Sequence, residues 1–242
     1  MLRGNHEDKN VNRHLGFGEE CAKRLEEDIN SPNSVFQKIN EVFESLPLVA
    51  IINDKTINTR IFCVHGGIGS TVHKLEDIEK IKRPCEISLG EATNQEQQMI
   101  VDLLWSDPLD NEEETGVQAN QIRDPTQSNN ITRFGADRVD KFLKSNNLSI
   151  ILRSHQNCPD GIDRFASGSL ITVSSCTDYC GKYNNDACFI VVQKRLVISP
   201  KIIKPTPQSK QSWVEFNIQS IPESVSPVIR RPHTPLKPQP KQ

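Results

Sequence analysis

Apolar side chains recur at helical spacing in the first part of the chain. Residues 8–27 predict one helix, and a second predicted helix runs from about residue 31 to residue 46. The second helix carries one apolar stripe, formed by Phe36, Ile39, Val42, Phe43 and Leu46. Ser31 is its predicted N-cap, because serine favours that position, and Pro32 suits the first helical residue. Pro47 ends the helix.

Shorter apolar runs follow, and most of them predict strands. Residues 48–53 and 60–64 predict a hairpin, and β-branched runs at 148–152, 170–173, 187–192 and 196–203 predict further strands. Short helices are predicted at 73–84 and 137–145, while the polar stretches 85–98 and 109–130 predict exposed loops. Helices and strands that alternate early and strands that dominate late indicate a mixed α/β layered fold.

Composition divides the chain into two parts. Its 242 residues fit one domain, residues 1–205, followed by a tail at 206–242. Eight of the fifteen prolines lie from residue 205 onward, and beyond residues 213–218 this tail has little to bury. The tail is therefore predicted to be disordered.

Charge and cysteine usage narrow the functional classes. A formal net charge of -2 gives no electrostatic reason to expect nucleic acid or an anionic membrane as a partner. No apolar run approaches the ~20 residues that span a bilayer. The seven cysteines have irregular spacing, which is typical of neither a disulfide framework nor a zinc ribbon. We therefore expect a reducing compartment, the cytoplasm, the nucleus or both.

Three short segments place a histidine where polar chemistry is expected. They are Leu-Arg-Gly-Asn-His-Glu at residues 2–7, His-Gly-Gly at 65–67 and Arg-Ser-His-Gln at 153–156. The last two follow apolar runs, so their histidines are predicted to lie at strand ends. If these three histidine segments meet in the fold, they indicate a metal-assisted hydrolase. A lone histidine after a strand is more often a surface residue, and His14, His73 and His233 receive that interpretation; Asn5 could also be a helix N-cap.

These segments, with Leu-Leu-Trp-Ser-Asp-Pro at 103–108 and Asp-Tyr-Cys-Gly at 178–181, occur in the order of a known family. The chain resembles the phosphoprotein phosphatases, the serine/threonine phosphatases related to types 1 and 2A and calcineurin. It is most similar to the Kelch-repeat branch over roughly residues 1–205. The resemblance implies a calcineurin-like metallophosphoesterase fold, with mixed β-sheets sandwiched with helices. It also implies hydrolysis of phosphoserine and phosphothreonine by metal-activated hydroxide.

The resemblance assigns roles to individual residues. Asn5, His65 and His155 would ligate one metal ion, and His6 would protonate the departing serine or threonine oxygen. Tyr179 would overhang the site. Arg123 would grip the phosphate, although Asp124 follows it where the family has glycine. The family uses two divalent ions (manganese, iron or zinc), and the chain carries ligands for only one of them.

Two family blocks, Gly-Asp-x-His-Gly and Gly-Asp-x-x-Asp-Arg-Gly, are absent from the sequence. We therefore expect a fold without its N-terminal strands, and an isolated chain that hydrolyses phosphoserine poorly or not at all. The alternative is a catalytically dead pseudophosphatase that acts as a protein-interaction module. Expected partners are phosphoprotein substrates and regulatory subunits. A weaker interpretation gives the tail a role as a phosphorylation target at Ser226 and Thr234, each followed by proline.

Overall fold

The computed structural model describes residues 1–87, 92, 94–124 and 131–206. Its helices are α1 (Lys9–His14), α2 (Phe17–Leu25), α3 (Val35–Ser45), α4 (Leu75–Glu79), α5 (Gln95–Trp105) and α6 (Ala136–Asn146). Its strands are β1 (Val49–Asp54), β2 (Thr59–Val64), β3 (Asp107–Pro108), β4 (Val117–Ala119), β5 (Thr132–Phe134), β6 (Ile150–Arg153), β7 (Ile162–Phe165), β8 (Leu170–Val173), β9 (Ala187–Val192) and β10 (Ile198–Ile203). The predicted disordered tail, Ser226 and Thr234 included, lies outside the described residues beyond position 206.

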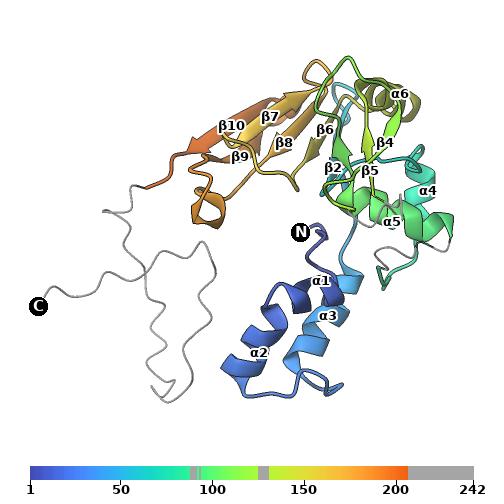
Figure 1. Cartoon of the computed structure of the whole chain (residues 1–242). Coiled ribbons are helices and arrows are strands. Elements are labelled where there is room, and N and C mark those ends of the chain that lie inside the picture. Colours follow the sequence, from blue (N-terminus) through green and yellow to red (C-terminus); the bar gives the residue numbers. More distant parts are fainter. Residues whose placement is uncertain (88–91, 93, 125–130, 207–242) are drawn as a thin grey trace, which may run out of the picture.

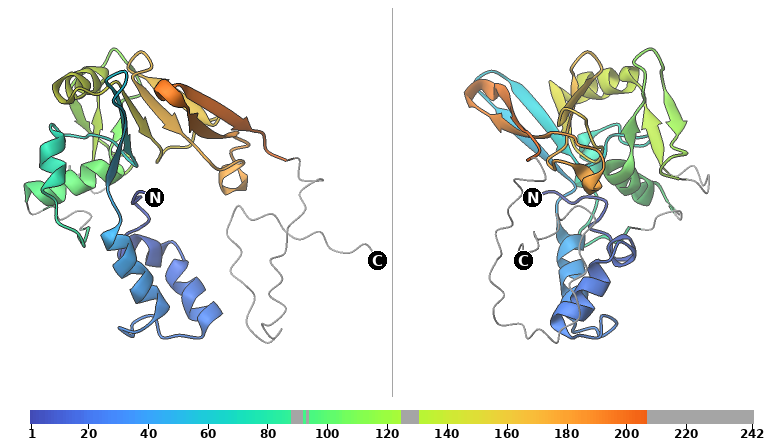
Figure 2. Two further views of the ribbon diagram at one scale, coloured as in Figure 1. Left: turned by 180° about the vertical axis from the view of Figure 1, so that it is seen from behind. Right: turned by 60° about the vertical axis from the view of Figure 1, so that its left-hand side comes forward.

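A mixed five-stranded sheet of order β1-β2-β6-β8-β7 is the centre of the fold. β2, β6 and β8 are parallel, and β1 and β7 pair antiparallel at the two edges. The ribbon views place α4, α5 and α6 beyond one face of this sheet and the β9–β10 hairpin beyond the other (Figures 1 and 2). Because β2 and β6 are parallel neighbours, their carboxyl ends lie at the same edge of the sheet. That edge carries both predicted strand-end histidines.

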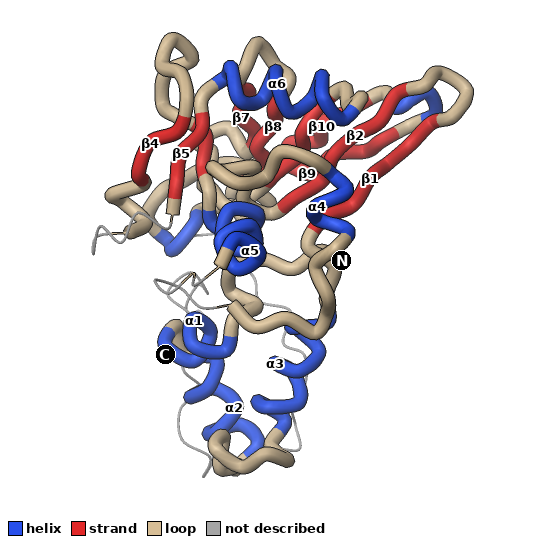
Figure 3. The backbone as a smooth tube through the Cα atoms, turned by 90° about the vertical axis from the view of Figure 1, so that its right-hand side faces the viewer, coloured by secondary structure: helices blue, strands red, loops and turns tan. Residues whose placement is uncertain are grey.

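The main hydrophobic core lies between the five-stranded sheet and the helices α4, α5 and α6. The rings of Phe62 in β2 and Phe142 in α6 meet edge to face, with centroids 5.1 Å apart. α5 is buried on nearly every side, and its buried apolar residues are Met99, Ile100, Val101, Leu103 and Leu104. A small sheet of order β3-β5-β4 follows α5 and extends this layer (Figure 3).

The helices α1, α2 and α3 form an excursion that stands apart from the sheets (Figure 1). The backbone N–H of Arg3 donates to the carbonyl oxygen of Pro47 at 2.9 Å, so the chain meets itself where the excursion starts and ends. Inside it, Asn12 of α1 donates to Asn40 of α3 at 2.7 Å, with both side chains buried.

Three details of the predicted helices are wrong. Residues 8–27 form two helices rather than one, because Gly16 adopts a φ of 98° between them and breaks the helical path. The N-cap of the next helix is Ser34, whose hydroxyl accepts from the N–H of Gln37 at 3.2 Å, and not Ser31. Helix α4 is also shorter than the predicted helix at 73–84.

The hairpin at 48–64, the helix at 137–145 and the strands at 148–152, 170–173 and 187–192 are confirmed within one or two residues. The predicted polar loop at 85–98 is wrong in its last part, because α5 begins at Gln95 after an Asn94 N-cap. The predicted loop at 109–130 contains β4, and β7 was not predicted. All seven cysteines are free thiols. No helix among the described residues is long and apolar enough to cross a membrane.

Candidate metal centre

The turn at residues 3–8 holds the first motif in place. The N–H of Gly4 donates to a carboxylate oxygen of Glu7 at 2.8 Å, and the buried guanidinium of Arg3 donates to the carbonyl of Glu7 at 3.0 Å. A Cβ on Gly4 would lie 2.6 Å from that carboxylate and 3.2 Å from the His65 ring, so a larger residue here would displace the Glu7 carboxylate. Asp8, and not Asn5, is the N-cap of α1, which leaves the Asn5 side chain available for the site.

His65 follows β2 directly, as the sequence predicts. The N–H of Gly66 donates to the carbonyl of Leu103 at 2.8 Å, and a Cβ on Gly66 would lie 2.6 Å from the backbone of Leu104. Gly66 therefore lets the C-terminal end of α5 pack against the backbone itself. The amide oxygen Oδ1 of Asn5 lies 2.8 Å from Nε2 of His65.

His155 lies two residues beyond β6 in the left-handed region, with φ at 70°. Its ring centroid is 5.0 Å from that of His65, and the ring of Trp105 meets it edge-on at 5.6 Å. Its side chain is 2% exposed, yet Nε2 has no hydrogen-bond partner among the described residues. A buried nitrogen that lacks a partner is costly unless something else binds it. This is the feature expected of a metal ligand.

Electrostatics keep both imidazoles neutral. Burial, with Arg153 and Arg123 nearby, lowers the pKa of His65 to about 4. Burial and the same two arginines lower the pKa of His155 still further below its usual value. A neutral imidazole keeps a lone pair for a metal ion. Both rings are therefore in the protonation state that ligation requires.

A buried carboxylate fixes the loops around these histidines. Asp107 accepts from Arg153 and Arg123, each at 2.9 Å, and from the amide of Asn120 at 2.9 Å. Arg153 is fully buried and also donates to the carbonyl of Gly66 at 2.6 Å. The resemblance gave no role to Asp107, Arg153 or Asn120, although two of them lie in the motifs. Their function is visible only once the loops are folded together.

The predicted site residues border one pocket of about 400 Å³. Every predicted site residue lines it, namely Asn5, His6, His65, Arg123, His155 and Tyr179. Arg123 donates through Nη2 to the carbonyl of His155 at 3.1 Å, so it reaches the site in spite of its poor motif match. The other lining residues are Glu7, Ser154, Gln156, Asn157, Ser174, Ser175 and Cys176.

The predicted donor set suits a transition metal. Two imidazoles and an amide oxygen fit manganese, iron or zinc. Among the described residues, no group of three or more histidine, cysteine, aspartate or glutamate side chains is placed to hold a metal ion. The predicted ligands therefore rely on Asn5 as the third donor, and the Asp107 carboxylate lies 4.0 Å from Nε2 of His155.

The chain belongs to the calcineurin-like phosphoesterase family, whose sequence profile matches residues 1–159. Serine/threonine-protein phosphatase BSL2 of Arabidopsis thaliana is 40% identical to it over 212 residues, which are 88% of this chain and 19% of BSL2. A protein serine/threonine phosphatase of Saccharomyces cerevisiae, described as similar to human phosphatase PP5, superposes with a TM-score of 0.66 at 28% identity. The match covers 85% of this chain and 60% of the yeast chain. The chain thus spans about a fifth of BSL2, and the predicted calcineurin-like fold is confirmed.

Proposed function

We propose that this chain carries part of a serine/threonine phosphatase active site, with Asn5, His65 and His155 as ligands of one divalent metal ion. The observation that carries the proposal is the buried Nε2 of His155, which lies beside the ring of His65 and has no hydrogen-bond partner among the described residues. The family membership and the names of the relatives support a phosphomonoester as the substrate. Metal ions bound there would polarise the phosphate and generate the nucleophile at neutral pH.

Two side chains of the pocket, Arg123 and His6, are placed to bind the phosphate and to donate a proton to the leaving oxygen. Arg123 lines the pocket, and its guanidinium bonds to the described residues run through Nε and Nη2, so Nη1 can donate to a phosphate oxygen. Burial and Arg123 lower the pKa of His6, while Glu7 opposes this shift. The charge of a bound phosphate would raise that pKa again. His6 could then protonate the leaving oxygen.

Manganese binding to the 242-residue chain tests the ligand assignment. We expect His155→Gln to weaken binding, measured by electron paramagnetic resonance of free Mn²⁺, by about 10- to 100-fold. His14→Gln is the matched control, because His14 lies in the last turn of α1 away from the pocket. Equal manganese binding by wild type and His155→Gln would overturn the assignment.

Phosphate release tests the chemistry. A chimera that places a segment with the two absent family blocks before Met1 should release phosphate from a phosphothreonine peptide in manganese, and His155→Gln should abolish this release. A chimera that binds manganese and releases no phosphate would overturn the hydrolase proposal and favour a protein-interaction module. The proposed regulatory subunits and the cytoplasmic or nuclear location need separate pull-down and imaging experiments.

A further inference from the structure

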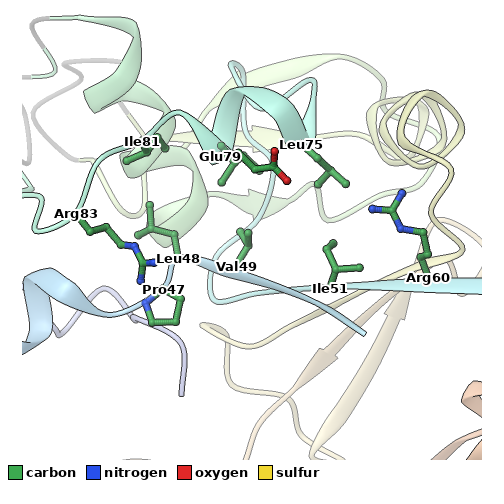
Figure 4. A pocket seen from close by; sticks show the side chains of 10 residues that line it. Pro47, Leu48, Val49, Ile51, Arg60, Leu75, Glu79, Ile81 and Arg83 are labelled. Carbon is green, nitrogen blue, oxygen red and sulfur yellow. The ribbon is translucent and has the colours of Figure 1, made fainter. Parts of the chain in front are cut away.

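A second pocket, of about 320 Å³, lies between β1 and α4 (Figure 4). Its floor is apolar: β1 contributes Val49 and Ile51, and α4 contributes Leu75 and Ile78. This groove shares no lining residue with the metal pocket. Binding in this groove is therefore independent of the proposed metal site.

The groove runs along an open strand edge. β1 is the outer strand of its sheet and pairs only with β2 among the described residues. An edge strand presents unpaired backbone N–H and C=O groups, and proteins commonly guard such edges with charges or proline. Pro47 precedes β1 and Asp54 ends it, but residues 49–53 between them, Val-Ala-Ile-Ile-Asn, contain neither a charge nor a proline. Such an edge is competent to pair with an extended peptide.

Two arginines mark the ends of the groove. Figure 4 shows Arg83 at the Pro47 end, Arg60 at the Ile51 end and Glu79 between them. Arg83 donates to the carbonyl of Ser45 and Arg60 to the carbonyl of Asn146, each at 3.0 Å. The ion pairs found among the described residues involve neither arginine. Both cations thus remain available to a carboxylate from outside.

The strand register sets the spacing of a ligand. Val49 pairs with Val64 and Asn53 with Arg60, so the side chains of Val49, Ile51 and Arg60 share one face. Alternate residues of a strand added to β1 would point to that same face. Glu79 above the middle of the groove disfavours an acidic residue there.

We propose that this groove binds an extended segment of a partner protein in which two apolar side chains, two residues apart, are flanked by acidic residues. The pattern is acid-x-apolar-x-apolar-x-acid. The segment adds a strand to β1, places its apolar side chains against Ile51 and Ile78, and pairs its outer carboxylates with Arg60 and Arg83. Apolar burial supplies the affinity and the two arginines fix the register.

The probe is a fluorescein-labelled palindromic peptide, Glu-Thr-Val-Thr-Val-Thr-Glu, capped at both ends, with binding to the 242-residue chain measured by fluorescence anisotropy. Its symmetry makes strand direction immaterial. We expect Arg83→Glu and Arg60→Glu each to weaken binding by about tenfold, since each turns an attraction into a repulsion. Lys82→Glu is the matched control, because the neighbouring Lys82 carries the same charge outside the groove.

Two peptide changes sharpen the test. A peptide with lysine at both ends should bind the double variant Arg60→Glu/Arg83→Glu better than wild type. N-methylation of all the inner peptide amides should abolish binding, because one alternate set of them faces β1 whichever way the added strand runs. Equal binding by Arg83→Glu and Lys82→Glu, or unchanged binding of the fully N-methylated peptide, would overturn the proposal.

Two further measurements test whether a second copy of the chain or the chain's own tail fills the groove instead. If the chain forms dimers in sedimentation that Arg83→Glu separates, and the peptide does not compete, a second copy fills the groove and the partner proposal is wrong. If the peptide binds only after Phe216→Asp in the apolar stretch at 213–218, the chain's own tail is the occupant, and the proposal is likewise overturned. Peptide binding to the unaltered chain with the expected variant pattern supports it.

Discussion

Removal of the Asp107 carboxylate should destabilise the whole molecule, because it strands a buried charge. Arg153 is fully buried, and Asp107 is its only carboxylate partner among the described ion pairs. Breaking a buried ion pair by deleting one partner costs about 3–5 kcal/mol. Arg153 would keep its bonds to the carbonyls of Gly66 and Ser106, so we expect Asp107→Ala to lower the free energy of unfolding by about 3 kcal/mol, near the bottom of that range.

Urea unfolding followed by circular dichroism measures this loss, provided that the slope with denaturant is unchanged. The matched control is Asp110→Ala. Asp110 also pairs with an arginine, Arg133, but its side chain is 79% exposed. An exposed pair contributes about 0–1 kcal/mol, so the control should differ little from wild type. Equal losses from the two substitutions would refute the argument that burial makes the Asp107 pair costly to break.

A double-mutant cycle isolates the pair itself. Because Arg153→Met removes the charge that Asp107→Ala strands, the double variant should be more stable than the sum of the single losses predicts, by about 2 kcal/mol. A coupling energy near zero would mean that Asp107 acts mainly through Arg123 and Asn120, the other groups that it accepts from.

Three further predictions concern other parts of the chain. Burial raises the pKa of the Cys158 thiol to about 11. The stability that the buried neutral thiol contributes is complete below the pKa of the unfolded thiol and is lost as the pH rises from about 9 to 11. The urea midpoint should therefore fall over that pH range, and Cys158→Ala should make the fall smaller. Gly67→Ala would place a Cβ 2.3 Å from the ring of Phe134, so it should cost about 1–3 kcal/mol in urea unfolding and weaken manganese binding at the adjacent His65; unchanged stability would contradict the clash. Ser34→Ala should cost about 1 kcal/mol in thermal unfolding, whereas Ser31→Ala should cost a few tenths, and the reverse order would restore Ser31 as the cap.

The strand-end histidines could be predicted because their signal is local. Apolar runs before His65 and His155 indicate strands, and the parallel pairing of β2 with β6 brings the ends of those strands together. Asn5 and His6 carry no such signal: the described residues before them form no strand, and only the motif identifies them. The position of Arg123 depends on tertiary contacts, because its guanidinium donates to the Asp107 carboxylate and to the carbonyl of His155.

The errors in the helices also have physical causes. The carboxylate of Glu27 accepts from the N–H groups of Val35 and Phe36, at 2.7 and 3.0 Å. This contact from eight residues upstream supports the helix start at Ser34, while Ser31 and Pro32 satisfy only a local rule. α5 has no clear polar face, because it is buried on nearly every side, so helical periodicity does not reveal it.

The bond between Arg3 and Pro47 has a consequence for how this molecule can change over evolutionary time. The bond between Arg3 and Pro47 forms a neck that joins the chain before α1 to the chain after α3. Longer or shorter helices between these two residues would therefore move neither Asn5 nor β1. The entropy of closing such a loop grows only slowly with its length. The same neck joins the turn that holds Asn5 to Pro47, which borders the groove beside β1. The helical excursion can therefore vary freely, while its neck is expected to tolerate little.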